Sequence, residues 1–175
     1  RGIRWLAMPH NDEACWQRVL SIAPYFTPHM ATRGAAIDDD HPHEGGTYPY
    51  PILTALASQD KNLVYLLAKA IVEGFDDYKM ADPGSIGWDI NRQQFQWVVP
   101  FHDGSVEYFK QLGMWTPERA AHNLALIRRQ DLLDSTWQEM LRKDISEDDA
   151  FSAQWYQLRA MRLKQAGFDP VWEEI

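Results

Sequence analysis

The segment that begins at Thr116 constrains the fold most, because it predicts one long helix. Thr116-Pro117-Glu118 places a capping hydroxyl, a proline suited to the first turn and an acid at the positive end of the helix dipole. The helix is expected to extend to about Arg142 and rules out an all-β fold. Its predicted apolar side consists of Leu126, Leu133, Trp137 and Leu141.

A second helix is predicted in the C-terminal part of the chain. Ser146 is expected to open it, with Asp149 completing a weaker variant of the capping box, and Gly167 closes it. Its predicted stripe consists of Phe151, Trp155, Leu158 and Met161. Apolar stripes at this spacing are typical of helix packing.

Three further helices are predicted before these two. They are a helix capped by Asn11 and ended by Pro24, a helix capped by Asp60 and running to about Tyr78, and a helix over Ser105–Leu112 stopped by Gly113. The second of them is expected to carry Leu63, Leu67, Ile71 and Phe75 on one face, since these residues lie four apart.

Extended segments are few and short. The β-branched and aromatic run 3–8 predicts a strand, and the apolar run 50–57 predicts a buried one. Segment 25–37 is expected to contain one extended piece, and 95–104 is also expected to be extended. These strands are too few for a sheet of their own, so we predict a helix-rich α/β fragment whose strands need partners from elsewhere.

Composition excludes several classes of function. The 175 residues carry a net charge of −8, which repels nucleic acid on average. The single Cys15 excludes an intramolecular disulfide and is expected to be a small buried apolar residue. No apolar run reaches the ~18 residues that span a bilayer. Because the chain opens on Arg1 and not on Met, we expect an upstream targeting segment to have been lost.

The acidic loop 38–44, with the sequence DDDHPHE, holds the residues best suited to a metal. Its candidate ligands are Asp40, His41, His43 and Glu44, since carboxylates and imidazoles suit zinc, manganese or iron. An i, i+2 histidine pair around a proline is a poor ligand geometry, because tight sites take ligands from separate elements. We therefore favour a solvated loop and predict neither a metal nor a cofactor.

Two other residues stand out singly. His102 precedes a predicted helix and is expected to hydrogen-bond within its turn, because no catalytic partner for it is evident. Arg33, among small residues, can face a carboxylate ligand with its bidentate guanidinium, or it can be solvated. No nucleophile elbow, P-loop, dinucleotide-binding or HExxH motif is present, so we do not predict an enzyme.

The order of motifs resembles the C-terminal half of the TAXI-type solute receptors of tripartite ATP-independent periplasmic (TRAP) transporters. The matching stretches are GTYP at 46–49, LVY at 63–65, and HDGSVEYFKQLG at 102–113. The Gly-Gly-Thr-Tyr-Pro stretch at 45–49 is expected to form a turn. Asp103 and Ser105 replace a proline and an alanine of the family pattern. The resemblance covers residues 1–115 and leaves 116–175 as a C-terminal helical extension.

This resemblance implies one part of a two-lobed periplasmic-binding-protein fold of type II. The expected function is to bind a small organic acid or amino acid in the periplasm and deliver it to the membrane subunits of the transporter. The other partner is the missing N-terminal lobe of the same protein. By matching position, Thr47 and Tyr48 lie near the ligand with Tyr50 close by, and Arg33 is our hypothesis for the group that binds the anion.

Two alternatives from other classes stay open. One is a metal-dependent hydrolase that uses loop 38–44. The other is a helical interaction module in which the tryptophan-rich helices 117–142 and 147–166 dock to a partner.

Overall fold

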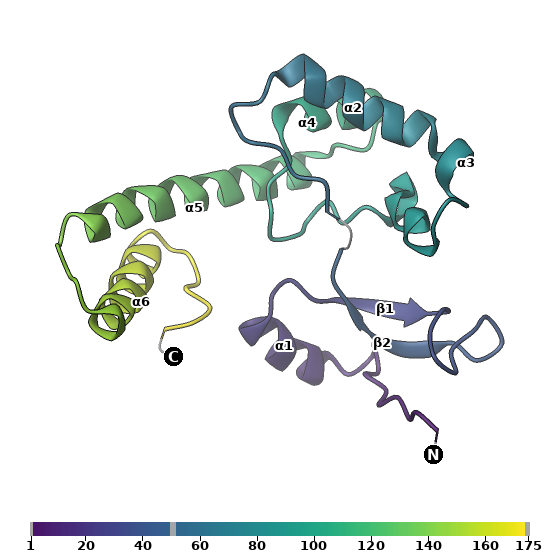
Figure 1. Cartoon of the computed structure of the whole chain (residues 1–175), viewed down its shortest axis with the longest axis horizontal. Helices are drawn as coiled ribbons and strands as arrows, with labels where there is room; N and C mark the ends of the chain where they lie inside the picture. Colours follow the sequence, from purple (N-terminus) through teal and green to yellow (C-terminus); the bar gives the residue numbers. More distant parts are fainter. Residues whose placement is uncertain (1, 50–51, 174–175) are drawn as a thin grey trace. The chain divides into compact units, whose positions relative to one another are not determined.

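The chain forms two compact units in the computed structural model, which describes residues 2–49 and 52–173 (Figure 1). One unit combines Arg1–Tyr48 with Lys143–Ile175, and the other is Pro49–Arg142. Helices make up 52% of the chain and strands 7%, which agrees with a helix-rich α/β fragment. The two units are divided after residues 48 and 142. The domain boundary predicted between 115 and 116 stays a prediction.

The N-terminal segment of the first unit is a short helix followed by an antiparallel hairpin. Helix α1 (Glu13–Ile22) is capped by Asp12, whose side chain accepts from the Cys15 amide. Asp12 therefore takes the place predicted for Asn11. Strands β1 (Thr27–Ala31) and β2 (His43–Thr47) pair with Thr27 opposite Thr47 and Ala31 opposite His43.

Gly46 of β2 makes room for a tryptophan. Trp16 of α1 is 5% exposed, and a Cβ added to Gly46 would lie 3.0 Å from its ring. The sequence suggested a turn at Gly45-Gly46-Thr47, but these residues continue the strand. They pair with residues 27–29 of β1, and a glycine is suited to position 46 because a side chain there would compete with the indole for space.

The predicted strand at 3–8 does not form. Between described residues, one backbone hydrogen bond joins this segment to the hairpin, from Met8 N to Glu44 O at 2.9 Å, and Ile3 and Leu6 are exposed. The Trp5 indole donates to Ala35 O at 2.7 Å. A β-branched and aromatic composition was a poor guide here, because a strand also needs a continuous hydrogen-bonded neighbour.

Helix α6 (Asp148–Gln165) belongs to the same unit and starts two residues after the predicted opening. Glu147 caps it by accepting from the Ala150 amide, so Ser146 lies outside the helix. Gly167 ends it with φ +77, as predicted. The residues buried along α6 are Leu158, Arg159, Ala160 and Leu163. Of the predicted stripe, Leu158 is buried, Phe151 and Trp155 are half-buried, and Met161 is exposed.

The second unit is helical. Asp60 caps α2 (Lys61–Glu73) as predicted, by accepting from the Leu63 amide. Gly74 separates α2 from the short α3 (Phe75–Tyr78), and two 3-10 turns follow, η1 (Pro83–Trp88) and η2 (Ile90–Arg92). Among residues 52–57 of the predicted buried strand, none is in a strand and all are exposed. Segment 95–104 likewise contains no strand, and its last two residues begin a helix.

Helices α2 and α4 (Asp103–Gln111) pack backbone against backbone. A Cβ on the buried Gly104 would lie 2.4 Å from Lys61 O and 2.7 Å from Tyr65 N. The face of α2 used here contains the buried Val64, whereas the predicted Leu63 and Leu67 are exposed. The absent side chain of Gly104 therefore sets how closely the two helices approach.

An aromatic core lies beside this contact. Phe95, Tyr108 and Phe109 are buried in it, and the partly buried Tyr65, Phe101 and Trp115 pack around them. Helix α5 (Pro117–Leu141) starts at the predicted Thr116 cap and holds the segment before α4. Its Asn123 accepts from Phe101 N at 2.7 Å and donates to Phe101 O at 3.3 Å.

Candidate functional site

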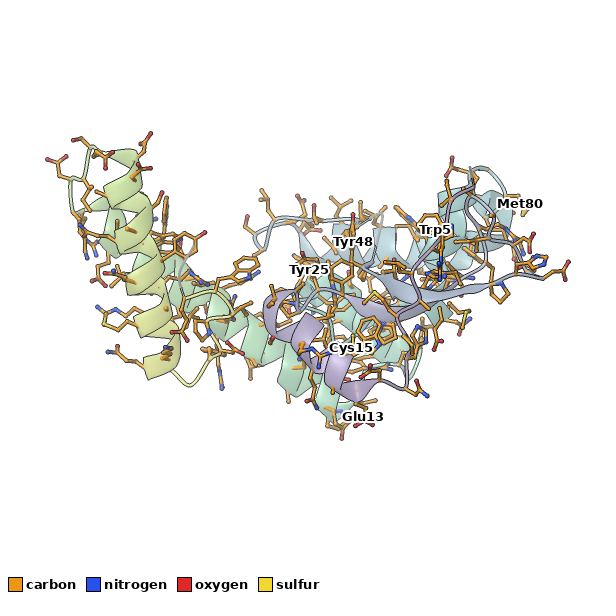
Figure 2. The ribbon with its side chains drawn as sticks, turned by 90° about the horizontal axis from the view of Figure 1, so that it is seen from below. Trp5, Glu13, Cys15, Tyr25, Tyr48 and Met80 are labelled. Carbon is orange, nitrogen blue, oxygen red and sulfur yellow. The ribbon has the colours of Figure 1, made fainter. Side chains whose placement is uncertain are left out.

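The strongest candidate for a binding surface is one end of the hairpin, where three rings and two hydroxyls meet. Tyr25 precedes β1 and Tyr48 follows β2 (Figure 2). The third ring is that of Phe26, the residue just before β1. Tyr48 meets the other two edge-on, with ring centroids 6.3 and 6.2 Å away. The paired Thr27 and Thr47 complete this group, which we call the aromatic end.

The antiparallel register explains why these residues come together. Thr27 opens β1 and Thr47 closes β2, so the residues just outside the pair are direct neighbours. The Thr27 hydroxyl donates to Thr47 O at 3.4 Å, and the Thr47 hydroxyl donates to Tyr48 O at 3.3 Å. The hydroxyls thereby fix the turn of the chain out of the strand.

The aromatic end offers the chemistry that small ligands use. Tyr48 is 48% exposed, so about half of the residue's surface faces solvent. Aromatic side chains with a polar tip provide apolar contact and a directed hydrogen bond at the same time. The predicted residues Thr47 and Tyr48 belong to this group, and Tyr50 lies outside the described residues.

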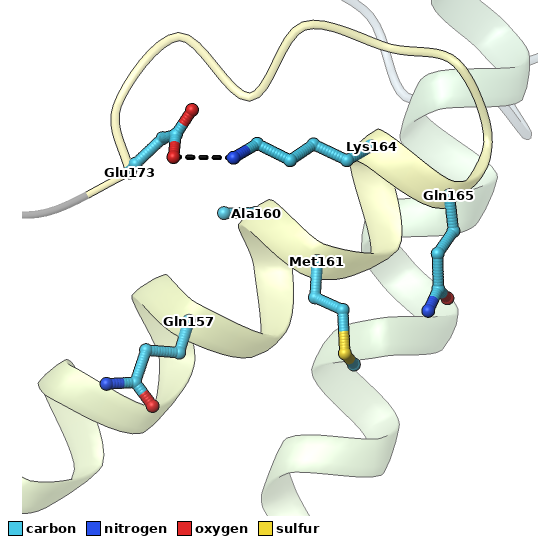
Figure 3. A pocket seen from close by; sticks show the side chains of 6 residues that line it. All are labelled: Gln157, Ala160, Met161, Lys164, Gln165 and Glu173. Atoms are coloured by element: carbon cyan, nitrogen blue, oxygen red, sulfur yellow. Dashed lines mark hydrogen bonds and ion pairs between the residues drawn. The ribbon is translucent and has the colours of Figure 1, made fainter.

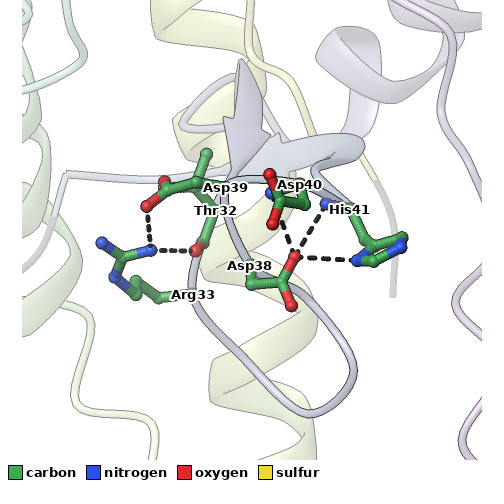
Figure 4. A network of polar contacts seen from close by, with 6 residues as sticks. All are labelled: Thr32, Arg33, Asp38, Asp39, Asp40 and His41. Carbon is green, nitrogen blue, oxygen red and sulfur yellow. Dashed lines mark hydrogen bonds and ion pairs between the residues drawn. The ribbon is translucent and has the colours of Figure 1, made fainter.

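Arg33 lies at the opposite end of the hairpin. It follows β1, whose length separates the Thr27 and Ala31 pairs by roughly 13 Å at ~3.3 Å per residue. Its guanidinium donates to Asp39 and to Thr32 O, each at 2.8 Å (Figure 4). The structure thus brings Thr47 and Tyr48 together but places Arg33 in a solvated ion pair within the acidic loop.

The acidic loop is organised around Asp38 (Figure 4). One oxygen of this carboxylate accepts from the amides of Asp40 and His41, at 3.1 and 2.7 Å, and lies 3.0 Å from the His41 ring nitrogen. The hydrogen bond from the His41 ring, with that from the His41 amide, lowers the pKa of Asp38 below its ordinary value. These side chains are exposed, so the loop is solvated, as favoured from the sequence.

The other two metal candidates lie in β2 with different partners. Glu44 Oε1 accepts from the His10 amide at 2.7 Å and lies 3.7 Å from the His10 ring. His43 packs its ring 6.0 Å from that of Trp5. Within residues 2–49 and 52–173, no three His, Cys, Asp or Glu side chains gather so as to hold a metal ion.

The remaining motif residues are used for packing and helix ends. His102 caps α4 by accepting from the Gly104 amide, as expected for a histidine that orders its turn. Tyr108 and Phe109 belong to the core, and Gly113 follows α4 with φ +69. Burial, and then the charge of Glu73, raises the pKa of Tyr108, which is a structural consequence of its place in the core.

A shallow hollow lies on α6 and the segment that follows it (Figure 3). The Lys164 ammonium and the Glu173 carboxylate pair across it at 2.5 Å. Its other lining residues are Gln157, Ala160, Met161 and Gln165. Because both charges are satisfied by each other, the hollow offers a ligand little beyond two amides and an apolar floor.

Sequence reasoning missed three members of the aromatic end. Tyr25, Phe26 and Thr27 lie at the start of the segment predicted to contain an extended piece. Their juxtaposition with Tyr48 depended on a hairpin that was not predicted, because 45–47 suggested a turn. The available signal was that aromatic residues precede the first of two β-compatible segments and follow the second, as expected for neighbours at one end of a hairpin.

The chain matches no protein-family model, no curated protein and no solved structure. None of the helices formed by residues 2–49 and 52–173 is long and apolar enough to cross a membrane. The interaction-module hypothesis stays a prediction; Leu124 and Leu141 of α5 are 47% and 52% exposed.

Proposed function

We propose that this chain is part of a TAXI-type solute receptor of a TRAP transporter and that its aromatic end contacts the solute. The expected solute is a small organic acid or amino acid. In this proposal the chain contributes to a two-lobed binding protein of type II, acts in the periplasm without catalysing a reaction, and delivers its solute to membrane subunits.

The observation that carries the proposal is the aromatic end itself. Thr47 and Tyr48 come from the GTYP motif, and the fold adds Tyr25, Phe26 and Thr27 to them. Two phenols and two hydroxyls on an apolar surface suit a ligand that has both a carbon skeleton and polar groups. The ion pair between Arg33 and Asp39 argues against Arg33 as the anion-binding group, so the proposal assigns it no role.

A second line of support comes from the other two motifs. The LVY and HDG stretches meet in one tight contact, since Gly104 packs on the backbone of α2 next to Val64. Residues far apart in sequence thus share one structural role. A contact between the two motif stretches is what we expect if both serve to form the same fold.

The test is ligand-induced stabilisation of the protein, measured over a panel of organic acids and amino acids. A ligand at 100 times its dissociation constant raises the free energy of unfolding by ~2.7 kcal/mol. Tyr48→Ala is expected to weaken binding of the ligand about tenfold, because it removes both the ring contact and the phenol.

Tyr156→Ala on α6 is the matched control, since it removes a ring and a phenol elsewhere in the chain. Its ligand affinity is expected to equal that of the wild type. Absence of stabilisation by every compound, or equal binding by Tyr48→Ala, would contradict the proposal.

A further inference from the structure

The hydrogen bond by which a histidine caps α4 can form in only one protonation state of the imidazole. The Gly104 amide lies 3.0 Å from His102 Nδ1. An amide N–H can only donate, so Nδ1 accepts and carries no proton. The cap therefore exists only while the imidazole is neutral, unlike caps formed by serine or asparagine.

The fold makes this hydrogen bond difficult to replace. Gly104 is buried, and its Cα faces the α2 backbone at Lys61 and Tyr65. The hydrogen bond itself is partly buried, so water replaces the imidazole less well here than at an exposed helix end. A buried donor left unsatisfied is costly, and a positive charge at a helix N-terminus adds repulsion from the helix dipole.

The charged groups around this helix end come from two helices. Asp103 and Glu107 of α4 attract an imidazolium, and Lys61 of α2 repels it. Glu107 is already paired with Lys61 at 2.6 Å. From α5, the neutral Asn123 holds the backbone of Phe101, and His122 contacts the Trp97 carbonyl. Asp103, the exposed acid of the first turn, follows His102 directly in the chain.

We propose that His102 is an acid-sensitive cap: neutral, it keeps the first turn of α4 closed on α2, and protonated, it releases that turn. The released turn includes Gly104, so the opening acts directly on the contact between α4 and α2. This inference goes beyond solute binding and depends on no part of it.

The test compares hydrogen exchange of the whole chain at about pH 5 and about pH 8, the range in which histidine titrates. Protection factors of the first-turn amides of α4, corrected for intrinsic exchange, are expected to fall about tenfold at the lower pH. In His102→Asn, which caps well and does not titrate there, the fall is expected to vanish. His41→Asn, in the exposed acidic loop, is the control and keeps the wild-type fall in α4.

A second readout needs no variant. In the wild type, the Gly104 amide proton is expected to shift in step with protonation of the His102 ring, followed by NMR. The proposal is overturned if His102→Asn keeps the pH-dependent loss of protection, or if the Gly104 amide does not respond to the ring.

Discussion

The α2–α4 pair and the β1–β2 hairpin both join segments distant in sequence, but they depend on different interactions. The helices meet through a buried glycine against backbone atoms, beside an aromatic core. The strands are joined by main-chain hydrogen bonds, and β1 alternates between half-buried and exposed residues. The helix contact depends on close steric fit, and the strand contact depends on main-chain hydrogen bonds. An added methyl group should therefore destabilise the helix pair more than the hairpin.

The largest effect is expected from Gly104→Ala. Its Cβ would lie 2.4 Å from Lys61 O, which is backbone and cannot rotate away. Helix α4 has to move off α2, and we expect a loss of about 3 kcal/mol in the free energy of unfolding, at the upper end for overpacking. Urea unfolding followed by circular dichroism measures it.

Gly113→Ala is the matched control for this substitution. No atom lies within 4 Å of a Cβ at this position, but φ is +69. Only the left-handed backbone is penalised, at about 1 kcal/mol. A Gly113→Ala variant as unstable as Gly104→Ala would show that the helix contact does not depend on fit.

A smaller loss is expected from Gly46→Ala in the hairpin. The added Cβ would lie 3.0 Å from the rim of the Trp16 ring, which can shift by a few tenths of an ångström. We expect a loss of about 1 kcal/mol, seen as faster hydrogen exchange of the β1 and β2 amides. Gly45→Ala meets only the His43 ring of its own strand, at 3.3 Å, and should cost less. If Gly45→Ala destabilised the hairpin more than Gly46→Ala, the contact between Gly46 and Trp16 would not be the one that limits side-chain size in β2.

The smallest effect is expected from Asp38→Asn in the acidic loop. The folded pKa of Asp38 lies below its ordinary 3.8, so its charge stabilises the loop above that pH and the contribution is lost as pH falls through the folded pKa. Because the group is fully exposed, the unfolding midpoint at neutral pH should stay within experimental error. An NMR titration that gives Asp38 a pKa above 3.8 would disprove the loop geometry.

The helices were predictable where a local signal marks their ends. Asp60 and Thr116 cap their helices as predicted, and Gly113 and Gly167 end theirs with positive φ. A cap is decided by neighbouring residues, so one sequence is enough to identify it. The errors of one residue at Asn11 and Ser146 arose because an adjacent acid, Asp12 or Glu147, competes for the same role.

The strands and the buried helix faces were not predictable in the same way. Segment 3–8 has strand composition without a strand, and β2 has glycines that suggested a turn. The buried face of α2 is the one that Gly104 of α4 packs against. The sequence of α2 alone does not indicate where on its surface that contact forms. For the same reason Thr47 and Tyr48 were found one by one, while their neighbours at the aromatic end were not.

The proline in β1 affects whether the hairpin can pair with strands of other copies of this chain. A two-stranded ribbon exposes two edges, and an exposed edge invites pairing with a strand of another molecule. Pro28, the second residue of β1, has no N–H to offer, and on the edge of β2 the Glu44 carbonyl is already bound to Met8. Both edges are therefore poor templates for edge-to-edge aggregation, and removing Pro28 would also remove a safeguard against fibre formation.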